Sequence, residues 1–274
     1  MIKIITLVEN TAISSDYGCK HGLSLYIETE KHKILFDLGP DGLFAENAEK
    51  LNIDISKVDT VVISHGHNDH AGALKKFMAL NSRAKIYIRK EAFEPHYIKV
   101  FGIPVYIGLD TSLISSNQLV FTNEITVIDE ELVLFSNVKS NNFNSESAGK
   151  LFAKKHGRLV HDDFVHEQNL IIKSGGKKAI VTGCSHSGIV NILDKAETVC
   201  PVITNAVIGG FHLYNPPTKK YESNSLIDST ADMLKEKSGT FYTCHCTGIK
   251  AYERMKKTLD DRLKYLSTGS EVLL

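Results

Sequence analysis

Short apolar runs separated by polar turns dominate the first third of the chain. The short apolar runs at 2–8, 23–29 and 33–38 predict strands, and the polar residues 30–32 between the last two predict a hairpin. Residues 42–51 follow with the pattern of a helix. The chain therefore begins with a strand-rich unit.

The later apolar runs continue in this style without a change in composition. Strands are predicted at 58–64, 85–89, 104–107, 119–121, 125–128, 132–135, 169–173, 178–182, 203–208 and 240–243 and near 265 and 272, and helices over 73–81, 188–199, 225–237 and 249–259. No Pro- or Ser-rich linker divides the chain, so we predict a single domain over 1–274. Two similar halves, each a mixed sheet with helices on its outer face, predict an α/β (α+β) fold with four αββα layers.

Periodicity fails over residues 137–166. A connection of this length without structure of its own is usually a lid or a binding loop. We expect a loop that covers the functional site, and a surface excursion without a role is the alternative.

The stretch His65-Gly-His67-Asn-Asp69-His70 places four possible metal ligands within six residues. It lies between a predicted strand and a predicted helix, and a turn there lets side chains one and two residues apart converge. Neutral imidazole and carboxylate are ligands that zinc prefers. The spacing predicts a metal site, whereas a solvated histidine-rich loop is the plainer alternative.

Three later strands also end in turns that carry histidine, at 182–188, 209–212 and 243–248. Ligands bind at the carboxyl ends of strands in open sheets, so we expect all of these turns to meet in one pocket. His186 and His245 are predicted metal ligands, because small residues crowd both of their turns.

The other groups in these turns allow two interpretations each. His212 is predicted to contact the substrate or to hydrogen-bond a metal ligand from outside the coordination sphere. Cys184 is either a thiolate that bridges two ions or an inert buried thiol. Cys244 and Cys246 are expected to be packing residues, since side chains alternate along a strand and His245 takes the other side.

The remaining histidines lack a comparable setting. His32 is expected to be solvated in its hairpin turn, whereas His21, just before a strand, could reach the site. No role is predicted for His96. Candidates for the pocket mouth are the histidines of the long loop, His156, His161 and His166.

Charge and cysteine content limit the partners and the cellular compartment that we expect for this protein. The 32 basic and 32 acidic residues cancel, so no global field favours nucleic acid or an anionic membrane. The first residues form too short an apolar stretch for a signal peptide, and no run reaches the ~20 apolar residues of a membrane span. We expect a cytoplasmic protein with a small-molecule substrate and five reduced cysteines. The oligomeric state is not determined by the sequence.

The signature His65-x-His67-x-Asp69-His70, together with an earlier strand that ends in Asp37, resembles the metallo-β-lactamase superfamily. The motifs at 21–24, 182–186, 209–213 and 245–248 are similar to those of its dihydropterin-6-methyl-(ribofuranosyl)aminobenzene-phosphate synthase-like branch. The resemblance covers most of the chain and implies that the sandwich is of the metallo-β-lactamase type.

The resemblance also implies two divalent metal ions, expected to be zinc, with iron or manganese as alternatives. It assigns His65, His67 and His186 to the first ion and Asp69, His70 and His245 to the second. Many relatives have a bridging Asp where this chain has Cys184, so either the thiolate bridges the ions or water alone does. Asp69 and His212 are the residues expected to take part in catalysis.

The resemblance leaves the reaction open. Two ions ~3.5 to 4 Å apart support hydrolysis of a phosphodiester, lactone or thioester. The branch implies instead the transfer of a dihydropterin methylene to an arylamine with release of diphosphate. Candidates for a pterin slot and a phosphate contact are Phe143, Phe164, Phe211, Tyr214, Lys219 and Lys220. An iron-binding redox or sensor protein is the remaining alternative.

Overall fold

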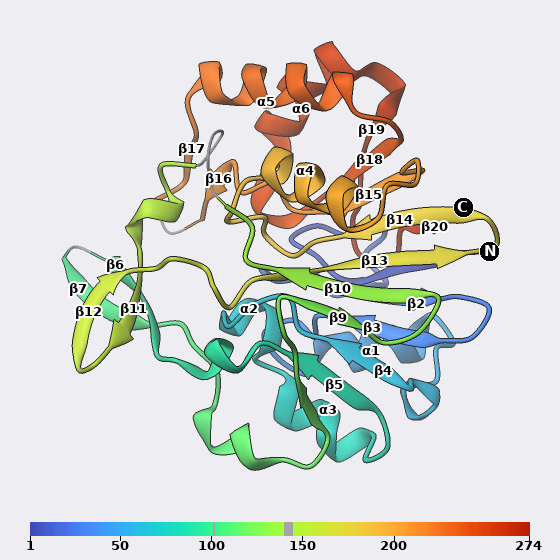
Figure 1. Cartoon of the computed structure of the whole chain (residues 1–274), viewed down its shortest axis with the longest axis vertical. Helices are drawn as coiled ribbons and strands as arrows, with labels where there is room; N and C mark the ends of the chain where they lie inside the picture. The colour runs from blue at the N-terminus through green and yellow to red at the C-terminus, as the bar shows by residue number, and fades with distance from the viewer. Residues whose placement is uncertain (101, 140–144, 217) are drawn as a thin grey trace.

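The computed structural model describes residues 1–100, 102–139, 145–216 and 218–274. Figure 1 shows two large sheets that face each other, with helices on the outer side of each. Both sheets contain parallel and antiparallel pairs. This confirms the predicted four-layer αββα arrangement.

The first sheet comes mainly from the N-terminal half and has the strand order β20-β1-β2-β3-β4-β5-β8. Its strands are β1 (Lys3–Val8), β2 (Ser24–Glu28), β3 (Lys33–Phe36), β4 (Thr60–Val62), β5 (Lys85–Ile88), β8 (Leu119–Phe121) and β20 (Glu271–Leu273). The predicted β2–β3 hairpin is present, with Leu25 opposite Phe36. Strands β3, β4, β5 and β8 run parallel, so their carboxyl ends share one edge.

The second sheet has the order β19-β18-β15-β14-β13-β10-β9. Its strands are β9 (Ile125–Val127), β10 (Leu132–Ser136), β13 (Gln168–Ser174), β14 (Lys177–Val181), β15 (Ala206–Gly209), β18 (Thr240–Thr243) and β19 (Leu263–Tyr265). Strands β14, β15, β18 and β19 are parallel. Strand β15 begins at Ala206 and not at residue 203 as predicted, because Ile203 is 74% exposed and lies outside the sheet.

Helices cover the outer face of each sheet (Figure 1). They are α1 (Leu43–Lys50) and α3 (Leu74–Leu80) on the first sheet, α4 (Ile189–Val199), α5 (Asn224–Glu236) and α6 (Ile249–Leu259) on the second, and the single turn α2 (Asn68–Ala71) at the histidine motif. Short 3₁₀ helices occupy Ile55–Lys57, Lys90–Phe93, Thr111–Ser115, Ala148–Lys150, His245–Thr247 and Asp260–Arg262.

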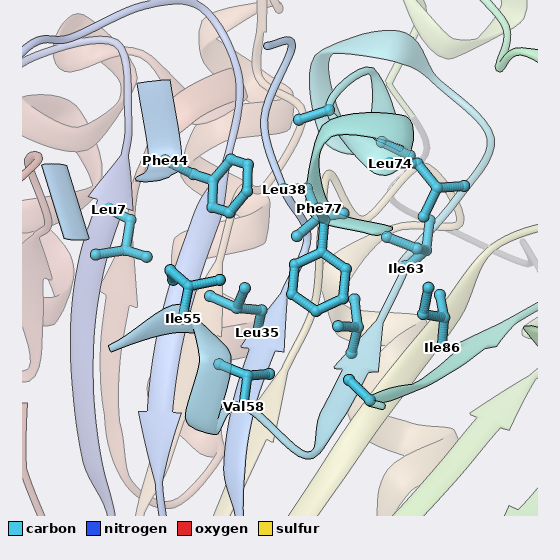
Figure 2. Packing of buried hydrophobic residues seen from close by; sticks show 14 of the residues in the cluster. Leu7, Leu35, Leu38, Phe44, Ile55, Val58, Ile63, Leu74, Phe77 and Ile86 are labelled. Carbon is cyan, nitrogen blue, oxygen red and sulfur yellow. The ribbon is translucent and has the colours of Figure 1, made fainter. Parts of the chain in front are cut away.

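Alternation of side chains along the strands produces three separate cores. Around β4, Val61 and Ile63 face the helices, while Val62 faces the other sheet. Figure 2 shows the outer core of the first sheet, where Phe44 of α1 and Phe77 of α3 pack beside the strand residues. A second core lies between the sheets and a third under α4, α5 and α6. Both faces of each sheet are therefore buried, which explains the nearly continuous apolar runs.

The prediction of a structureless loop over 137–166 is wrong for much of the segment. Residues in it form β11 (Leu151–Lys155) and β12 (Arg158–His161), which join β6 (His96–Val100) and β7 (Ile103–Tyr106) in a small sheet of order β12-β11-β6-β7. This sheet lies to the left of the sandwich in Figure 1. The sequence signal is weak because β11 pairs with β6, a strand far away along the chain, and most residues of β12 stay exposed.

A two-stranded ribbon of β16 (Tyr214–Asn215) and β17 (Lys220–Tyr221) completes the described strands. The two ends of the chain lie side by side, since Ile2 and Leu274 exchange backbone hydrogen bonds of 3.2 and 3.0 Å. Among the described helices, none combines the length and apolar character that a bilayer crossing requires.

Candidate metal centre

Five strands end near one another and deliver the predicted site residues. Asp37 follows β3, the histidine turn 65–70 follows β4, Cys184 follows β14, His212 follows β15, and His245 follows β18. The parallel direction of the strands within each sheet brings these ends together. The predicted convergence of the four turns is thus present, with Asp37 as a fifth contributor.

The backbone at these strand ends is strained. Asp37, Ser185, His212 and His245 have φ values of 58°, 59°, 49° and 52°, in the left-handed region that non-glycine residues avoid. Each such residue costs about 1–3 kcal/mol and persists only where surrounding structure holds it, typically at functional sites. Gly183 is required for lack of space and not for its φ angle, because a Cβ there would overlap Ser64 Oγ.

Two groups of possible ligands meet at Cys184. In the first group, His65 Nε2 and His186 Nε2 are 3.4 Å apart, and Cys184 lies within 4.8 Å of both ligand atoms. In the second, His70 Nε2 lies 3.1 Å from Cys184 Sγ and 3.2 Å from His245 Nε2. Cys184 thus belongs to both groups.

Asp69 joins the second group through its carboxylate. Its Oδ2 lies 3.3 Å from His245 Nε2 and 3.2 Å from His21 Nε2. The side-chain oxygen of Asn10 faces Nδ1 of both histidines, at 3.1 and 3.3 Å, and so sets the orientation of the two rings. The expectation that His21 could reach the site is confirmed.

Asp37 determines which nitrogen of two histidines faces the other ligands. Its Oδ2 lies 2.6 Å from His70 Nδ1 and accepts from Ser64 Oγ at 2.7 Å. The same hydroxyl lies 2.8 Å from His65 Nδ1. Because both Nδ1 atoms are engaged in this network, the Nε2 atoms of His65 and His70 are left as ligand atoms.

The protonation of the histidines suits metal binding in the first group. Burial lowers the pKa values of His65, His67 and His186 well below the usual value, and neighbouring imidazoles lower them further. Neutral imidazole is the form that binds a metal ion. For His70, burial also lowers the pKa, but the charges of Asp69 and Asp37 outweigh it and raise the pKa overall.

Several buried nitrogens have no hydrogen-bond partner among the described residues. Among the histidines, these are His67 Nε2, His186 Nδ1 and both ring nitrogens of His212. A buried polar atom without a partner costs about 1–3 kcal/mol, so such atoms need an explanation. Imidazoles, thiols and a carboxylate whose lone pairs are not engaged in hydrogen bonds form a ligand set that suits a borderline divalent ion such as zinc.

Cys246 departs from its expected packing role. It lines the pocket, and its thiol forms a possible ligand group with Cys184 and His212. Burial opposes ionisation of the Cys246 thiol, but the neighbouring Cys184 and His212 side chains lower its pKa overall. Burial and the neighbouring Cys246 raise the pKa of Cys184. Cys244 does pack as expected, in the core between the sheets. The short 3₁₀ helix at His245–Thr247 ends the strand alternation and turns Cys246 toward the pocket.

His67 lies between two clusters. Its ring centroid is 4.6 Å from that of His65 and 5.0 Å from that of His186. On another side it borders the buried residues His96, Asp162 and His166, with one possible ligand atom of each within 4.8 Å of the others.

The inner cluster around Asp162 is satisfied by hydrogen bonds. Asp162 Oδ2 lies 2.9 Å from His96 Nδ1 and 3.2 Å from His166 Nε2, and His166 Nδ1 accepts from the Gly66 N–H at 2.9 Å. Burial would raise the pKa of Asp162, but the two histidines lower it strongly. The cluster therefore fixes the backbone of the His65–His67 turn through the hydrogen bond from Gly66 to His166. Sequence reasoning missed it, although the dense run of His and Asp at 161–167 was a usable signal.

Most of the candidate ligands line a pocket of about 340 Å³, a volume suited to a small molecule, whereas His65 and His70 lie behind its lining. The rest of the lining is both apolar, with Ile98, Ile107, Leu151 and Pro216, and neutral polar, with Asn68, Ser147 and Asn215, and the described lining contains no Lys or Arg. His212 also lines the pocket.

Most of the residues proposed for a pterin or phosphate contact lie elsewhere. Phe211 is buried in the core under the helices. Lys219 and Lys220 are exposed, and neither they nor the partly buried Tyr214 line the pocket. Phe164 stacks on the ring of His186 at 4.6 Å, so it supports a ligand. Phe143 lies outside the described residues.

The other histidines also differ from expectation. His32 is not simply solvated, since its nitrogens lie 2.8 Å from Asp59 and 2.6 Å from Asp129. His156 and His161 are exposed and do not line the pocket. His166 is buried behind the histidine turn and not at a pocket mouth.

Comparison with known proteins places this site in context. The sequence model of the metallo-beta-lactamase superfamily matches residues 17–220. The chain is 30% identical to 7,8-dihydropterin-6-methyl-4-(β-D-ribofuranosyl)-aminobenzene-5′-phosphate synthase of Methanocaldococcus jannaschii, over 98% of this chain and 95% of that protein. It superposes on a metal-dependent hydrolase of the β-lactamase superfamily with a TM-score of 0.85 and 28% identity, covering 100% and 99% of the two chains. An anaerobic nitric oxide reductase flavorubredoxin of Aeromonas salmonicida is 29% identical over 45% of this chain and 25% of that protein.

Proposed function

Because this chain belongs to the metallo-β-lactamase superfamily and is a metal-dependent enzyme, we propose that it acts with two divalent ions, zinc by ligand preference, on a small molecule carrying a diphosphate or phosphoryl group. The proposed ligands are His65 and His186 with the adjacent His67 for the first ion, Asp69, His70 and His245 for the second, and Cys184 between them. When bound, such ions activate water and neutralise the charge that develops on a leaving group.

The observation that carries this proposal is the make-up of the pocket. Its ligand groups are His, Cys and Asp, whereas its other lining includes Ile98, Ile107 and Leu151 and, in the described residues, no cationic side chain. An anionic part of a substrate therefore has its best place at the ligand groups. A flat, weakly polar part, such as a pterin ring, has its best place against the isoleucines and Leu151.

The chain's own residues supply orientation and proton transfer. Asp69 is held by His21 and His245; burial opposes its ionisation, but the charge of His70 and these hydrogen bonds keep its pKa well below the usual value. It is thus a fixed carboxylate. His212 has both nitrogens free of described partners and lines the pocket, so it is placed to exchange a proton with the substrate.

A transfer reaction is favoured by the likeness to the Methanocaldococcus synthase. The arylamine nitrogen would attack the methylene carbon of a dihydropterin, forming a C–N bond as the C–O bond to diphosphate breaks. The electron pair leaves with the diphosphate, and the amine proton passes to a base, for which we propose His212.

Hydrolysis is the second candidate, favoured by the likeness to the metal-dependent hydrolase. Water would then replace the arylamine as nucleophile at the same pocket. The two reactions share the ligand groups but differ in the nucleophile and in the atom attacked, which is phosphorus or a carbonyl carbon in hydrolysis and a methylene carbon in transfer.

One set of assays separates these candidates. Protein of measured zinc content is tested on a dihydropterin methyl diphosphate with and without an arylamine, and on a generic phosphodiester and a lactone. We expect coupling of pterin to amine to exceed hydrolysis. The His186→Gln variant should lose at least about 100-fold in turnover, since changes outside the coordination sphere alone cost about 10–100-fold.

The matched control is His161→Gln, because His161 is exposed and lies outside the pocket lining. It should keep the zinc content and turnover of the unmodified protein. Full zinc occupancy without turnover of any of these substrates would contradict the proposal.

A further inference from the structure

One face of the small sheet is aliphatic where β6, β7 and the start of β11 lie side by side. In its register, Ile98 of β6 lies opposite both Val105 of β7 and Leu151 of β11, and Val100 lies opposite Ile103. Residues that are paired across strands point to the same side of a sheet. These five side chains therefore share one face.

This face begins in the pocket and continues to the surface. Ile98 and Leu151 line the pocket, and so does Ile107, which continues the register of β7 through its hydrogen bond to the His96 carbonyl. Further out along β7, Val105 is 45% exposed and Ile103 is 67% exposed. The apolar surface is thus continuous from the ligand groups to solvent.

The opposite face of the same sheet has a different composition. Lys99 lies over the ring of Phe152 at 4.2 Å, and Tyr97 packs against Tyr106 at 5.5 Å. Polar and amphipathic side chains of this kind are normal at a surface. On β6 and β7, the aliphatic side chains therefore lie on the face that leads to the pocket, whereas the other face carries Tyr97, Lys99, Pro104 and Tyr106. Exposed apolar residues in a row on an edge strand normally need a reason, because they invite aggregation.

We propose that this face binds the apolar tail, alkyl or aryl, of an amphipathic small molecule whose anionic head lies at the ligand groups. The inference rests on the proposed function for the head of the ligand. Two observations determine the class of occupant: the face is continuous with the pocket, and the described pocket lining contains no cation that would hold a second anionic group.

The probes are n-alkylphosphonates of increasing chain length and the matching n-alkanols, which lack the anionic head. Binding to the zinc-loaded protein is measured by calorimetry. We expect the Kd of the phosphonates to fall about fourfold for each added methylene until the chain passes Ile103, the ratio that corresponds to ~0.8 kcal/mol per buried methylene. The alkanols should show the same dependence at lower affinity.

Two substitutions test the location of the tail. Val105→Ser and Ile103→Ser should reduce the gain for long chains and leave methylphosphonate binding unchanged. The matched control is Val127→Ser, which removes an exposed strand valine at β9, outside the pocket lining and the small sheet. It should not change the dependence on chain length.

The possible outcomes separate the inference from the proposed function. Zinc-dependent binding of methylphosphonate without any gain from chain length overturns the inference alone. A gain with chain length for the alkanols, combined with no binding of methylphosphonate, supports the apolar face and contradicts the proposed anion site. Self-association of the unmodified protein that Ile103→Ser abolishes would show that a second copy covers this face, and would also overturn the inference.

Discussion

At the residue scale, one buried carboxylate organises the candidate centre. Asp37 lies at the end of β3 and binds His70 directly and His65 through Ser64. It also accepts the Ser64 backbone N–H at 2.7 Å. A histidine that binds a metal through one ring nitrogen is oriented by a hydrogen bond at the other. Asp37 engages the Nδ1 atoms, directly or through Ser64, and so leaves the Nε2 atoms of both histidines for a metal.

Asp37→Asn should therefore weaken metal binding while the fold is kept. An amide presents only one acceptor oxygen, so one of the contacts of Asp37 is lost. We expect zinc affinity to fall about 10–100-fold, measured by competition with a chelating dye. Asp163→Asn is the control, because Asp163 is a surface residue whose ion pair with Lys155 is exposed. Equal zinc affinity in Asp37→Asn and the unmodified protein would exclude this role.

At the element scale, each helix is held by one apolar side. Helix α3 buries Phe77 completely in the outer core of the first sheet, whereas Leu80, one turn later, is 43% exposed. Figure 2 shows Phe77 near Leu35 and Leu38. The helix that follows the histidine turn is thus anchored by Phe77.

Phe77→Ala should lower the free energy of unfolding by about 3–5 kcal/mol, because it removes a buried ring and leaves a cavity. Leu80→Ala in the same helix should change it by no more than about 0.5 kcal/mol. Urea unfolding followed by circular dichroism measures both. Similar losses for the two variants would mean that α3 does not pack as described.

The same scale shows why some elements escaped prediction. The long apolar strands and the helices were predicted because their period is local and strong. Strands β11 and β12 were not, because their pairing with β6 is decided by a distant segment and their faces are partly exposed. Cys246 was misassigned for a similar reason, since a 3₁₀ turn replaces the strand at His245.

At the scale of the whole molecule, His32 connects the two sheets. It lies in the β2–β3 turn of the first sheet and contacts Asp59 before β4 and Asp129 before β10 of the second sheet. Burial lowers the pKa of His32, but the hydrogen bonds to Asp129 and Asp59 outweigh it, and the pKa is raised overall. Folding therefore favours the protonated form of His32.

This contact should make stability depend on pH. A group with a raised pKa in the folded state contributes stability below its unfolded pKa of about 6.5, and the contribution is lost as pH rises through the folded pKa. His32→Gln should cost about 1–3 kcal/mol near pH 6 and clearly less near pH 9, since its hydrogen bonds involve charged groups. Urea unfolding of both proteins at the two pH values measures this. A cost that does not change with pH would contradict it.

The sequence by itself determined the layers of this protein and the local metal motif. Apolar period and turn chemistry act over a few residues, so the strands, the helices and the turn at 65–70 could be read directly from the chain. The strand-end turns with His186, His212 and His245 were also expected to join it, but the tertiary structure decided which further groups do. Asp37, His21, Cys246 and the cluster around Asp162 are brought there by strand pairing and by left-handed turns at strand ends. Such contacts depend on packing between segments far apart along the chain, which no local pattern encodes.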